Sequence, residues 1–462
     1  MAVGHRLDPS ILREYDIRGV VDESLNAEDV RAIARGFGTM IAGDHAATVA
    51  VGYDGRTTSP ALEAALVEGL TACGHSVVRT GLGPTPMLYY ATHVLEADAG
   101  LMVTGSHNPP EYNGIKIVSK GLPFYGADIQ NLGTVVAGGD FASGRGRVED
   151  RPMVEPYTDR LLAGYTGTSA LAVAWDAGNG ATGDVLQALT ARLPGRHVLL
   201  NETIDGTFPA HHPDPTVEAN LRQLKDAVRG ANCDLGIAFD GDGDRIGVVD
   251  SRERVLWGDQ LLAILARAVL EALPGATIIA DVKASQVLFD EIARLGGKPL
   301  MWRTGHSVIK SKMVETKAPL AGEMSGHIFY AHGYYGFDDA MFAAVRLLSD
   351  LSRTGESLAE LRDGLPETVN TPEIRFPCPD AQKWVVIDDV RRRLEDAKGI
   401  TVNDIDGVRV TSADGWWLLR ASNTQPVLVA RCESADVDGL QRLKDALAEQ
   451  LKLSGIEPPA LD

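Results

Sequence analysis

Three carboxylates alternate with glycines in the segment Asp240-Gly-Asp-Gly-Asp-Arg245, which directly follows an apolar run. Glycines permit a sharp turn at the end of a strand, so the side chains of Asp240, Asp242 and Asp244 are able to converge. A cation among them would relieve their repulsion, and oxygen ligands favour Mg²⁺ or Ca²⁺ over zinc. The calcium loop of helix-loop-helix proteins does not fit, because Arg245 and Ser251 replace its sixth-position Gly and twelfth-position Glu. A solvated acidic turn is the alternative.

A second loop with chemical potential is Thr104-Gly-Ser-His-Asn-Pro-Pro110, which also follows an apolar run. Gly105 allows a tight turn and the two prolines stiffen the exit, which would hold Ser106 in a defined position. A serine beside a histidine suggests a nucleophile. The acyl-transfer elbow G-x-S-x-G is absent, because Asn108 takes the place of its second Gly. A polar turn capped by its own side chains is the alternative.

Two further loops carry groups suited to sugars and phosphates. Glu323 and Ser325 lie two residues apart, so in an extended loop they share one side, where a carboxylate and a hydroxyl suit vicinal sugar hydroxyls. The segment Arg420-Ala-Ser-Asn-Thr-Gln-Pro426 offers a guanidinium, two hydroxyls, an amide and turn N–H groups, as a phosphate cradle requires. The sequence G-x-x-x-x-G-K-[ST] does not occur, which disfavours nucleotide binding by that route. Either loop taken alone is equally consistent with an ordinary polar loop.

The elements that position these loops alternate along the first three quarters of the chain. Strands are predicted at 48–52, 100–103, 171–175, 235–239 and 277–280, and helices at 27–42, 60–73, 217–228, 259–273, 286–295 and 336–351. A strand followed by an unusual loop recurs three times, which predicts three α/β units with loops at the carboxyl ends of strands. The Pro-rich stretch 372–379 is predicted to be a linker. A smaller α+β unit follows, with a strand at 416–419 and a helix at 437–451.

Composition narrows the class of protein. The 462 residues include 44 basic and 63 acidic ones, and the net charge of −19 argues against a nucleic-acid partner. An anionic chain that uses an anionic substrate must concentrate positive charge locally. Four widely spaced cysteines without a C-x-x-C pair are typical of reduced thiols. The N-terminal residues lack the apolar stretch of a signal peptide and no segment suits a bilayer, so we expect a cytoplasmic protein with no membrane partner.

Together the four loops resemble the motifs of the α-D-phosphohexomutases. That family has a phosphoserine loop T-G/A-S-H-N-P, a metal loop D-G-D-G-D-R, a sugar loop G-E-x-S and a phosphate loop R-x-S-N-T, and all four occur here in family order. The resemblance spans essentially the whole chain. Met324 is similar to the bacterial phosphomannomutase/phosphoglucomutase branch, whereas phosphoglucosamine mutases usually have Gln there. Gln425 is a departure, because that branch more often has Thr or Glu at this position.

The resemblance implies an α/β fold. Three related α/β domains with mixed sheets, at 1–150, 151–254 and 255–368, and a smaller C-terminal α+β domain, at 369–462, would surround a central active-site cleft. Ser106 would carry a phosphoryl group, and the metal Mg²⁺ would be bound by Ser106, Asp240, Asp242 and Asp244. The phosphoryl group would pass to the 1- or 6-hydroxyl of a hexose phosphate. The product, glucose or mannose 1,6-bisphosphate, would turn over in the site before its other phosphate returns to the serine.

The resemblance also implies roles for other residues. The catalytic residues besides the serine would be Arg18, His107, Lys116, Arg245 and His306. The substrate-binding residues would be Tyr15, Lys283, Glu323, Ser325, His327, Arg420, Ser422, Asn423 and Thr424. The sequence does not identify the general acid or base among them.

Mannose and glucose differ only in the orientation of the 2-hydroxyl. If Glu323 and Ser325 bind the 3- and 4-hydroxyls, as in the family branch that the chain resembles, the site distinguishes the two sugars only weakly. We therefore expect one enzyme for mannose and glucose phosphates, serving nucleotide-sugar and exopolysaccharide supply. The alternatives are a phosphoglucosamine mutase, a metal-dependent sugar phosphatase, and a non-catalytic sugar-phosphate binding module. The last of these would be expected to lack Ser106 or a metal-loop aspartate, and neither is lost. No signal specific to a dimer is present, so we expect a monomer or a weak homo-oligomer.

Overall fold

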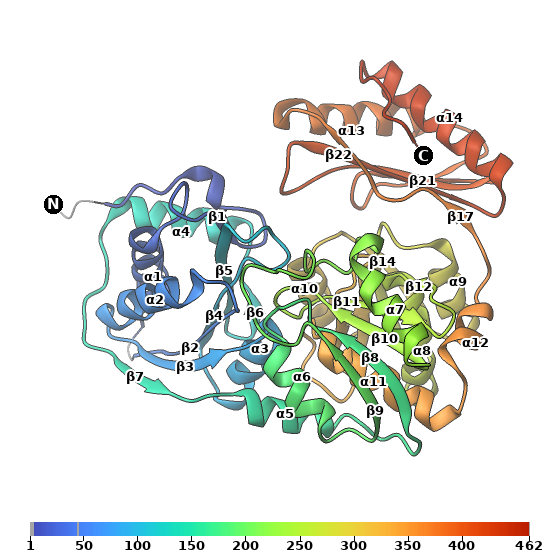
Figure 1. Cartoon of the computed structure of the whole chain (residues 1–462). Helices are drawn as coiled ribbons and strands as arrows, with labels where there is room; N and C mark the ends of the chain where they lie inside the picture. The colour runs from blue at the N-terminus through green and yellow to red at the C-terminus, as the bar shows by residue number, and fades with distance from the viewer. Residues whose placement is uncertain (1–3, 44–45, 462) are drawn as a thin grey trace.

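The computed structural model describes residues 4–43 and 46–461, which form four successive parts, each built on its own sheet (Figure 1). The first part contains β1 (Ile17–Val20), β2 (Thr48–Tyr53), β3 (Ser76–Leu82), β4 (Ala99–Val103), β5 (Tyr112–Ser119), β6 (Leu122–Pro123), β7 (Arg147–Asp150), α1 (Ala27–Ile41), α2 (Ser59–Ala72), α3 (Thr85–Val94) and α4 (Ala127–Gly138). Its mixed sheet has the order β1-β5-β4-β2-β3-β7, with β6 paired to β5.

The first sheet is buried on both faces. Val49 and Val51 of β2 lie in one apolar cluster with residues of α1, α2 and α4. Ala50, between them, joins Leu88 of α3 in a cluster on the opposite face. Burial on both sides explains why β4 is apolar along its whole length.

The second and third parts follow the same plan. The second contains β8 (Leu171–Asp176), β9 (Gly195–Leu200), β10 (Leu235–Phe239), β11 (Ile246–Asp250), β12 (Val255–Leu256), α5 (Val154–Leu162), α6 (Gly183–Thr190) and α7 (Arg222–Gly230). The third contains β13 (Thr277–Asp281), β14 (Lys298–Trp302), β15 (Leu320–Gly322), β16 (Ile328–Tyr330), α8 (Gly258–Ala272), α9 (Gln286–Arg294), α10 (His306–Thr316), α11 (Ala340–Thr354) and α12 (Leu358–Asp363).

One strand arrangement recurs in the three α/β parts. The orders β3-β2-β4-β5, β9-β8-β10-β11 and β14-β13-β15-β16 each have three parallel strands followed by an antiparallel one. The loop between the last two strands is the serine loop (residues 104–110) in the first part, the metal loop (240–245) in the second and the sugar loop (323–327) in the third. The prediction of three related α/β units with loops at strand ends is confirmed.

The C-terminal part has an antiparallel sheet and two helices. It contains β17 (Val369–Asn370), β18 (Ile374–Pro377), β19 (Thr401–Asn403), β20 (Val408–Ser412), β21 (Gly415–Ala421), β22 (Val427–Ser434), α13 (Asp380–Leu394) and α14 (Val437–Leu453). The order is β17-β22-β21-β20-β19, and β18 also pairs with β22. Trp417 of β21 and Leu443 of α14 belong to its separate apolar core.

Three sequence-based expectations need correction. The stretch 372–379 is not a plain linker, because Phe376 is buried in the core and β18 pairs with β22. Of its three prolines only Pro377 lies in the strand, as the last residue. The helix expected at 217–228 begins with the 3₁₀ turn η2 (Glu218–Leu221) before α7. The helix expected at 336–351 begins later, where the Asp339 side chain caps α11. The remaining predicted elements occur with ends that differ by no more than two residues.

Apolar clusters join the parts of the chain that carry the loops. One apolar cluster runs from the second part into the third and includes Trp175, Leu262 and Met341. The C-terminal part touches the third through a small cluster of Val282, Trp416 and Leu418, and in Figure 1 it lies above the rest of the chain. All four cysteines are buried and none forms a disulfide. Among the described residues, the helices include none whose length and apolar character would suit it to crossing a membrane.

Candidate active site

The metal loop joins β10 to β11 in an antiparallel hairpin. Gly243 has a φ of +74°, a conformation that glycine adopts without strain. The carboxylates of Asp240, Asp242 and Asp244 are fully buried and offer oxygens within 4.8 Å of one another. One oxygen of Asp242 and one of Asp244 have no hydrogen-bond partner in the described part of the chain. Buried, unpartnered carboxylate oxygens at this spacing fit a hard cation such as Mg²⁺.

Lys116, on β5, supplies the positive charge nearest these carboxylates. Its Nζ lies 2.7 Å from Asp242 and also donates to Asp244, and its side chain is 5 % exposed. Burial and the neighbouring carboxylates raise the pKa of Asp240 well above its ordinary value. Burial would also raise the pKa of Asp242, but the charge and hydrogen bond of Lys116 lower it instead. The pKa values of Asp240 and Asp242 are therefore shifted in opposite directions, and a bound cation would favour the ionised form of both.

The serine loop places Ser106 over the metal loop. The Ser106 Oγ donates to Asp240 at 2.9 Å and lies 3.2 Å from Nδ1 of His107. The backbone of Ser106 has a φ of +48°, which is strained for a residue with a side chain. Arg56, which is 1 % exposed, braces this turn by donating to the carbonyl oxygens of Ser106 and Asn108 at 2.7 and 2.6 Å. The fold thus holds the hydroxyl beside the carboxylates.

Cationic side chains surround the serine loop. Arg18 on β1 donates to the carbonyl oxygen of Gly105 at 3.1 Å and to the side chain of Asn108. Arg245 follows the metal loop and is partly buried at the wall of the cleft, where nearby carboxylates raise the pKa of its guanidinium although desolvation opposes this. Burial and the charges of Arg245 and Arg18 lower the pKa of His107 well below its ordinary value. His107 is therefore a neutral imidazole near pH 7, among fixed positive charges.

The third part contributes the sugar loop and the cationic side chain of Lys283. Glu323, which is 3 % exposed, accepts a hydrogen bond from the backbone N–H of Gly305 at 2.7 Å. His327 accepts from Nε of Arg245 at 3.0 Å. Lys283 follows β13 and donates to Glu373 at 2.9 Å.

The phosphate loop connects β21 to β22 in the C-terminal part. Arg420 is held by Asp406 at 3.1 Å, and Oγ of Ser422 accepts backbone N–H groups of the turn that follows it. Asn423 donates to the Tyr15 hydroxyl at 2.6 Å, so the first and last parts of the chain touch across the cleft. The Thr424 carbonyl accepts from Arg13 at 2.9 Å and makes a second such contact.

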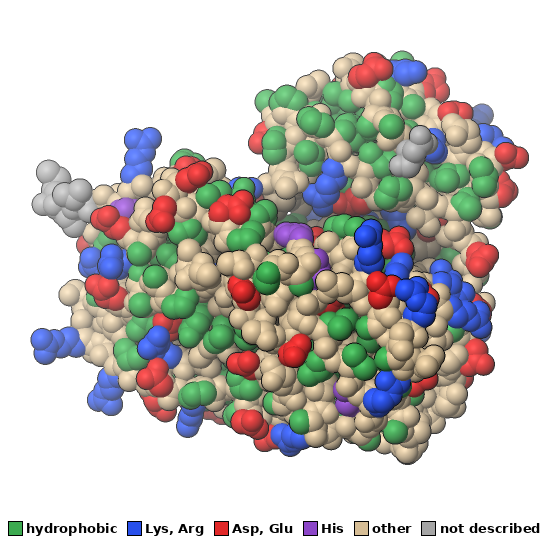
Figure 2. All heavy atoms as spheres, in the orientation of Figure 1, with side chains coloured by type: hydrophobic (Ala, Val, Ile, Leu, Met, Phe, Trp, Pro, Cys, Tyr) green, Lys and Arg blue, Asp and Glu red, His purple; other side chains and the backbone are tan. Residues whose placement is uncertain are grey.

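These loops line one cleft of about 960 Å³ between the four parts. Every predicted catalytic and substrate-binding side chain lines it: Tyr15, Arg18, Ser106, His107, Lys116, Arg245, Lys283, His306, Glu323, Ser325, His327, Arg420, Ser422, Asn423 and Thr424. Asp240, Asp242 and Asp244 lie behind its wall, fully buried. In Figure 2, histidine side chains gather where the upper part of the molecule meets the rest. The structure brings the predicted site residues together, while their individual roles stay predictions.

Four family models match the chain in succession. They describe alpha/beta/alpha domain I, domain II, domain III and the C-terminal domain of phosphoglucomutase/phosphomannomutase, and they cover residues 9–143, 155–253, 257–369 and 373–450. The chain belongs to the phosphoglucomutase/phosphomannomutase family. The resemblance inferred from the four loops is thereby confirmed.

Individual members of this family are similar over nearly the whole chain. A phosphomannomutase/phosphoglucomutase of Pseudomonas aeruginosa is 43% identical over 446 residues, which cover 96% of this chain and 96% of that protein. A phosphoglucomutase of Neisseria gonorrhoeae is 38% identical over 438 residues, or 94% of this chain and 95% of that protein. The crystal structure of a phosphoglucomutase/phosphomannomutase family protein from Burkholderia thailandensis has a TM-score of 0.91, with 40% identity and 99% of each chain covered.

The cleft is also lined by residues that the sequence analysis did not predict to belong to the site. Cleft-lining side chains that were missed include Arg13, Asp214, Trp257, Glu373, Arg375 and Arg431. Arg13 lies beside the predicted Tyr15 and was available as a signal. Glu373 and Arg375 lie in the stretch 372–379, and because this stretch was expected to be a linker, its side chains were not considered as site residues. Arg375 donates to Glu373 at 2.8 Å and to the Gln425 side chain at 3.1 Å, which gives the unusual Gln425 a specific partner.

Proposed function

We propose that this protein transfers a phosphoryl group reversibly between the 1- and 6-positions of hexose phosphates, through a phosphoserine and a sugar 1,6-bisphosphate. The carrying observation is Ser106 Oγ, held 2.9 Å from Asp240 in the cleft that the sugar and phosphate loops also line. Bound to Asp240, Asp242, Asp244 and Ser106, Mg²⁺ would offset negative charge on the group being transferred. We also propose domain divisions after residues 150, 254 and 368.

The remaining groups have defined tasks in this reaction. The free sugar hydroxyl attacks phosphorus and loses its proton to a base in the cleft, while the bond from phosphorus to Ser106 Oγ breaks and Oγ takes up a proton from an acid in the cleft. Arg18 and Arg245 balance charge on the transferred phosphoryl group. The phosphate that is not reacting binds Arg420 and the hydroxyl and amide groups of Ser422, Asn423 and Thr424. The sugar 1,6-bisphosphate then reverses its orientation and returns its other phosphate to the serine.

Exclusion of water favours a mutase over the alternative of a sugar phosphatase. Tyr15 and Arg13 contact the phosphate loop, so the cleft is bridged between the first and last parts of the chain. A phosphoserine enclosed in this way meets the sugar hydroxyl in preference to bulk water. Steady release of inorganic phosphate at the rate of isomerisation would favour the phosphatase.

The sugar class follows from Glu323, Ser325 and Met324. If the first two bind the 3- and 4-hydroxyls, one missing contact at the 2-hydroxyl changes kcat/KM by roughly tenfold. Met324 favours the glucose and mannose phosphate branch over the alternative, a phosphoglucosamine mutase. We therefore propose that both sugars are substrates.

The test is side-by-side kinetics on glucose 1-phosphate, mannose 1-phosphate and glucosamine 1-phosphate with trace bisphosphate. We expect comparable kcat/KM for the first two, and Glu323→Ala should reduce both in similar proportion. A ratio above about a thousand between them, or a variant impaired on only one, would reveal a dedicated 2-hydroxyl contact.

A further inference from the structure

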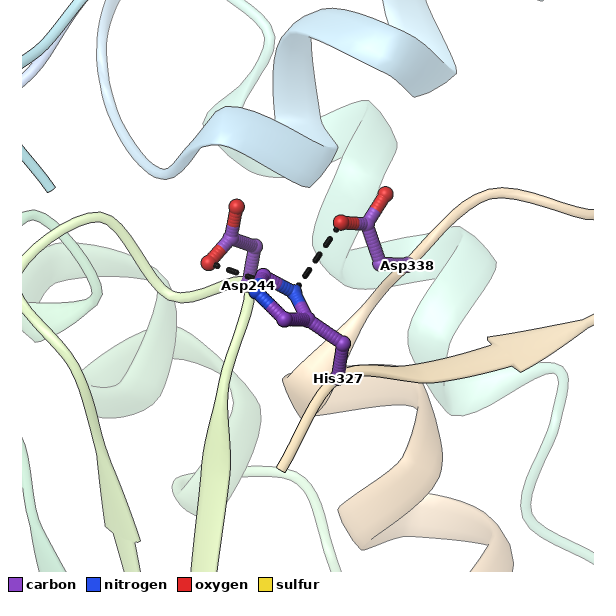
Figure 3. A group of neighbouring side chains, drawn as sticks. All are labelled: Asp244, His327 and Asp338. Atoms are coloured by element: carbon purple, nitrogen blue, oxygen red, sulfur yellow. Dashed lines mark ion pairs between the residues drawn. The ribbon is translucent and has the colours of Figure 1, made fainter. Parts of the chain in front are cut away.

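A buried carboxylate that the proposed reaction does not use lies behind the two histidines of the cleft. Asp338 is fully buried, just before the N-terminus of α11. Figure 3 shows the His327 ring between Asp338 and Asp244. Nδ1 of His327 lies 3.1 Å from Oδ2 of Asp338 and 3.7 Å from Oδ1 of Asp244. Within the described residues, neither His327 Nδ1 nor Asp338 Oδ2 has a well-aligned hydrogen bond to any group. Nδ1 is therefore available as a donor and Oδ2 as its acceptor.

The contact to Arg245 decides where the His327 proton resides. Nε of Arg245 lies 3.0 Å from Nε2 of His327, and a guanidinium N–H can only donate. Nε2 must therefore offer its lone pair, which leaves the ring proton on Nδ1. Nδ1 faces Asp338, and a small rotation would align the two groups, as often happens when substrate binds. The imidazole thus connects a buried carboxylate on one side with a cleft arginine on the other.

Lys310 holds the carboxylate in place. It lies one turn after His306 on α10, and its Nζ donates to Oδ1 of Asp338 at 2.8 Å. Burial alone would raise the pKa of Asp338, but the charge of Lys310, followed by the polar contact with His327, holds it well below its ordinary value. Oδ2 remains for the histidines, and the buried Nδ1 of His306 is 3.8 Å from it. The two imidazole rings stack with centroids 5.5 Å apart.

We propose that Asp338 is a positioning residue, which fixes His327 as the Nδ1–H tautomer and thereby holds Arg245 toward the phosphoryl group on Ser106. This inference rests on the proposed function for its effect on rate, while the tautomer itself does not depend on it. Lys310 acts one step further back by fixing the carboxylate. The arrangement follows the general pattern in which a carboxylate orients a histidine that acts on a third group.

A metal ion at Asp244, His327 and Asp338 is the competing explanation, since their ligand atoms lie within 4.8 Å of one another. A metal on Nδ1 of His327 would move the ring proton to Nε2. Two N–H donors would then face each other, because Nε of Arg245 lies 3.0 Å from Nε2 of His327. The hydrogen-bond pattern therefore favours the positioning role.

The test is Asp338→Asn, which keeps the shape of the side chain and removes its charge. We expect kcat to fall by about 100-fold with KM changed by less than about threefold, because the substrate contacts remain. Asp338→Glu should restore part of kcat. The matched control is Asp339→Asn, which alters the next residue, an equally buried carboxylate bonded to Tyr157, Tyr334 and the N–H of Phe342. This control should keep the wild-type kcat.

A spectroscopic measurement separates the proposal from the proposed function. Nitrogen NMR of histidine-labelled protein, assigned with His327→Gln, should show the Nδ1–H form in the wild type and its loss in Asp338→Asn. If Asp338→Asn does not fold, the double variant Lys310→Met/Asp338→Asn, which removes both charges of the ion pair, replaces it in the same measurements. An unchanged tautomer, or kcat retained within about threefold in a folded variant, would overturn the proposal. Absence of mutase activity in the wild type would instead refute the proposed function and leave the tautomer result standing.

Discussion

The phosphate loop is supported from behind by a buried lysine, and Lys383→Met tests how far that support determines substrate binding. Lys383 on α13 is 4 % exposed. Its Nζ donates to the carbonyl oxygens of Ser422 and Gln425 at 2.7 and 3.1 Å. Its third contact, Asp380, has a largely exposed side chain and contributes little. Methionine keeps the length of the side chain and removes both bonds to the loop.

The expected magnitude follows from these two bonds. A hydrogen bond to a charged group contributes about 1.5–3 kcal/mol, and water can replace part of it at the loop, so the C-terminal domain should lose about 2–4 kcal/mol of stability. If about 1.4 kcal/mol of this favours the binding-competent loop, the equilibrium constant for that loop conformation falls about tenfold, and KM rises by up to about tenfold. We expect kcat to change by less than about threefold, because Lys383 touches no reacting atom.

Steady-state kinetics on glucose 1-phosphate and thermal unfolding of the same preparations measure both effects. Lys398→Met is the matched control, since it removes the same charge from an exposed position of the same domain. A lower Tm with an unchanged KM would show that Lys383 stabilises the domain without ordering the loop. An unchanged Tm and KM would refute the reasoning altogether.

Three further predictions concern the reacting serine, the metal and pH. Ser106→Ala should lower turnover by more than about a thousandfold and alter Tm little, because among the described residues the hydroxyl hydrogen-bonds only with Asp240 and His107. Mass spectrometry should find phosphate on the wild-type peptide 104–110, and retained activity in the variant would contradict the covalent route. Mg²⁺ should raise Tm and restore activity after chelation, and Asp242→Asn should weaken both responses; full activity in chelator would make the acidic loop structural. Burial raises the pKa of Asp339 to about 6, so its contribution to stability is present at pH 4 and lost as pH rises through 6. Asp339→Asn should therefore reduce the fall in the free energy of unfolding between pH 4 and 7.5 by about 2–3 kcal/mol, as measured by urea unfolding. If the free energy of unfolding changes with pH equally in the wild type and the variant, this prediction is wrong.

The sequence predicted the four loops because their chemistry is local. Asp240, Asp242 and Asp244 lie within five residues, and repulsion among them signals a cation without reference to the rest of the chain. Residues that support the loops carry no such signal. Arg56 braces Ser106 from fifty positions away, and Lys383 meets the phosphate loop only through the packing of α13 on its sheet. An isolated buried cation is indistinguishable in sequence from a solvated one.

The convergence of the loops has two separate causes, and only one is visible in the sequence. Within each α/β domain, parallel strands place their carboxyl ends at one edge, which puts the serine, metal and sugar loops at equivalent positions. The orientation of one domain relative to the next comes from contacts between distant segments, such as the apolar cluster shared by the second and third parts. Positive charge gathers at the resulting cleft, where Arg18, Lys116 and Arg245 meet, although the chain carries a net charge of −19. An anionic protein thus attracts an anionic substrate through the arrangement of its domains and not through its composition.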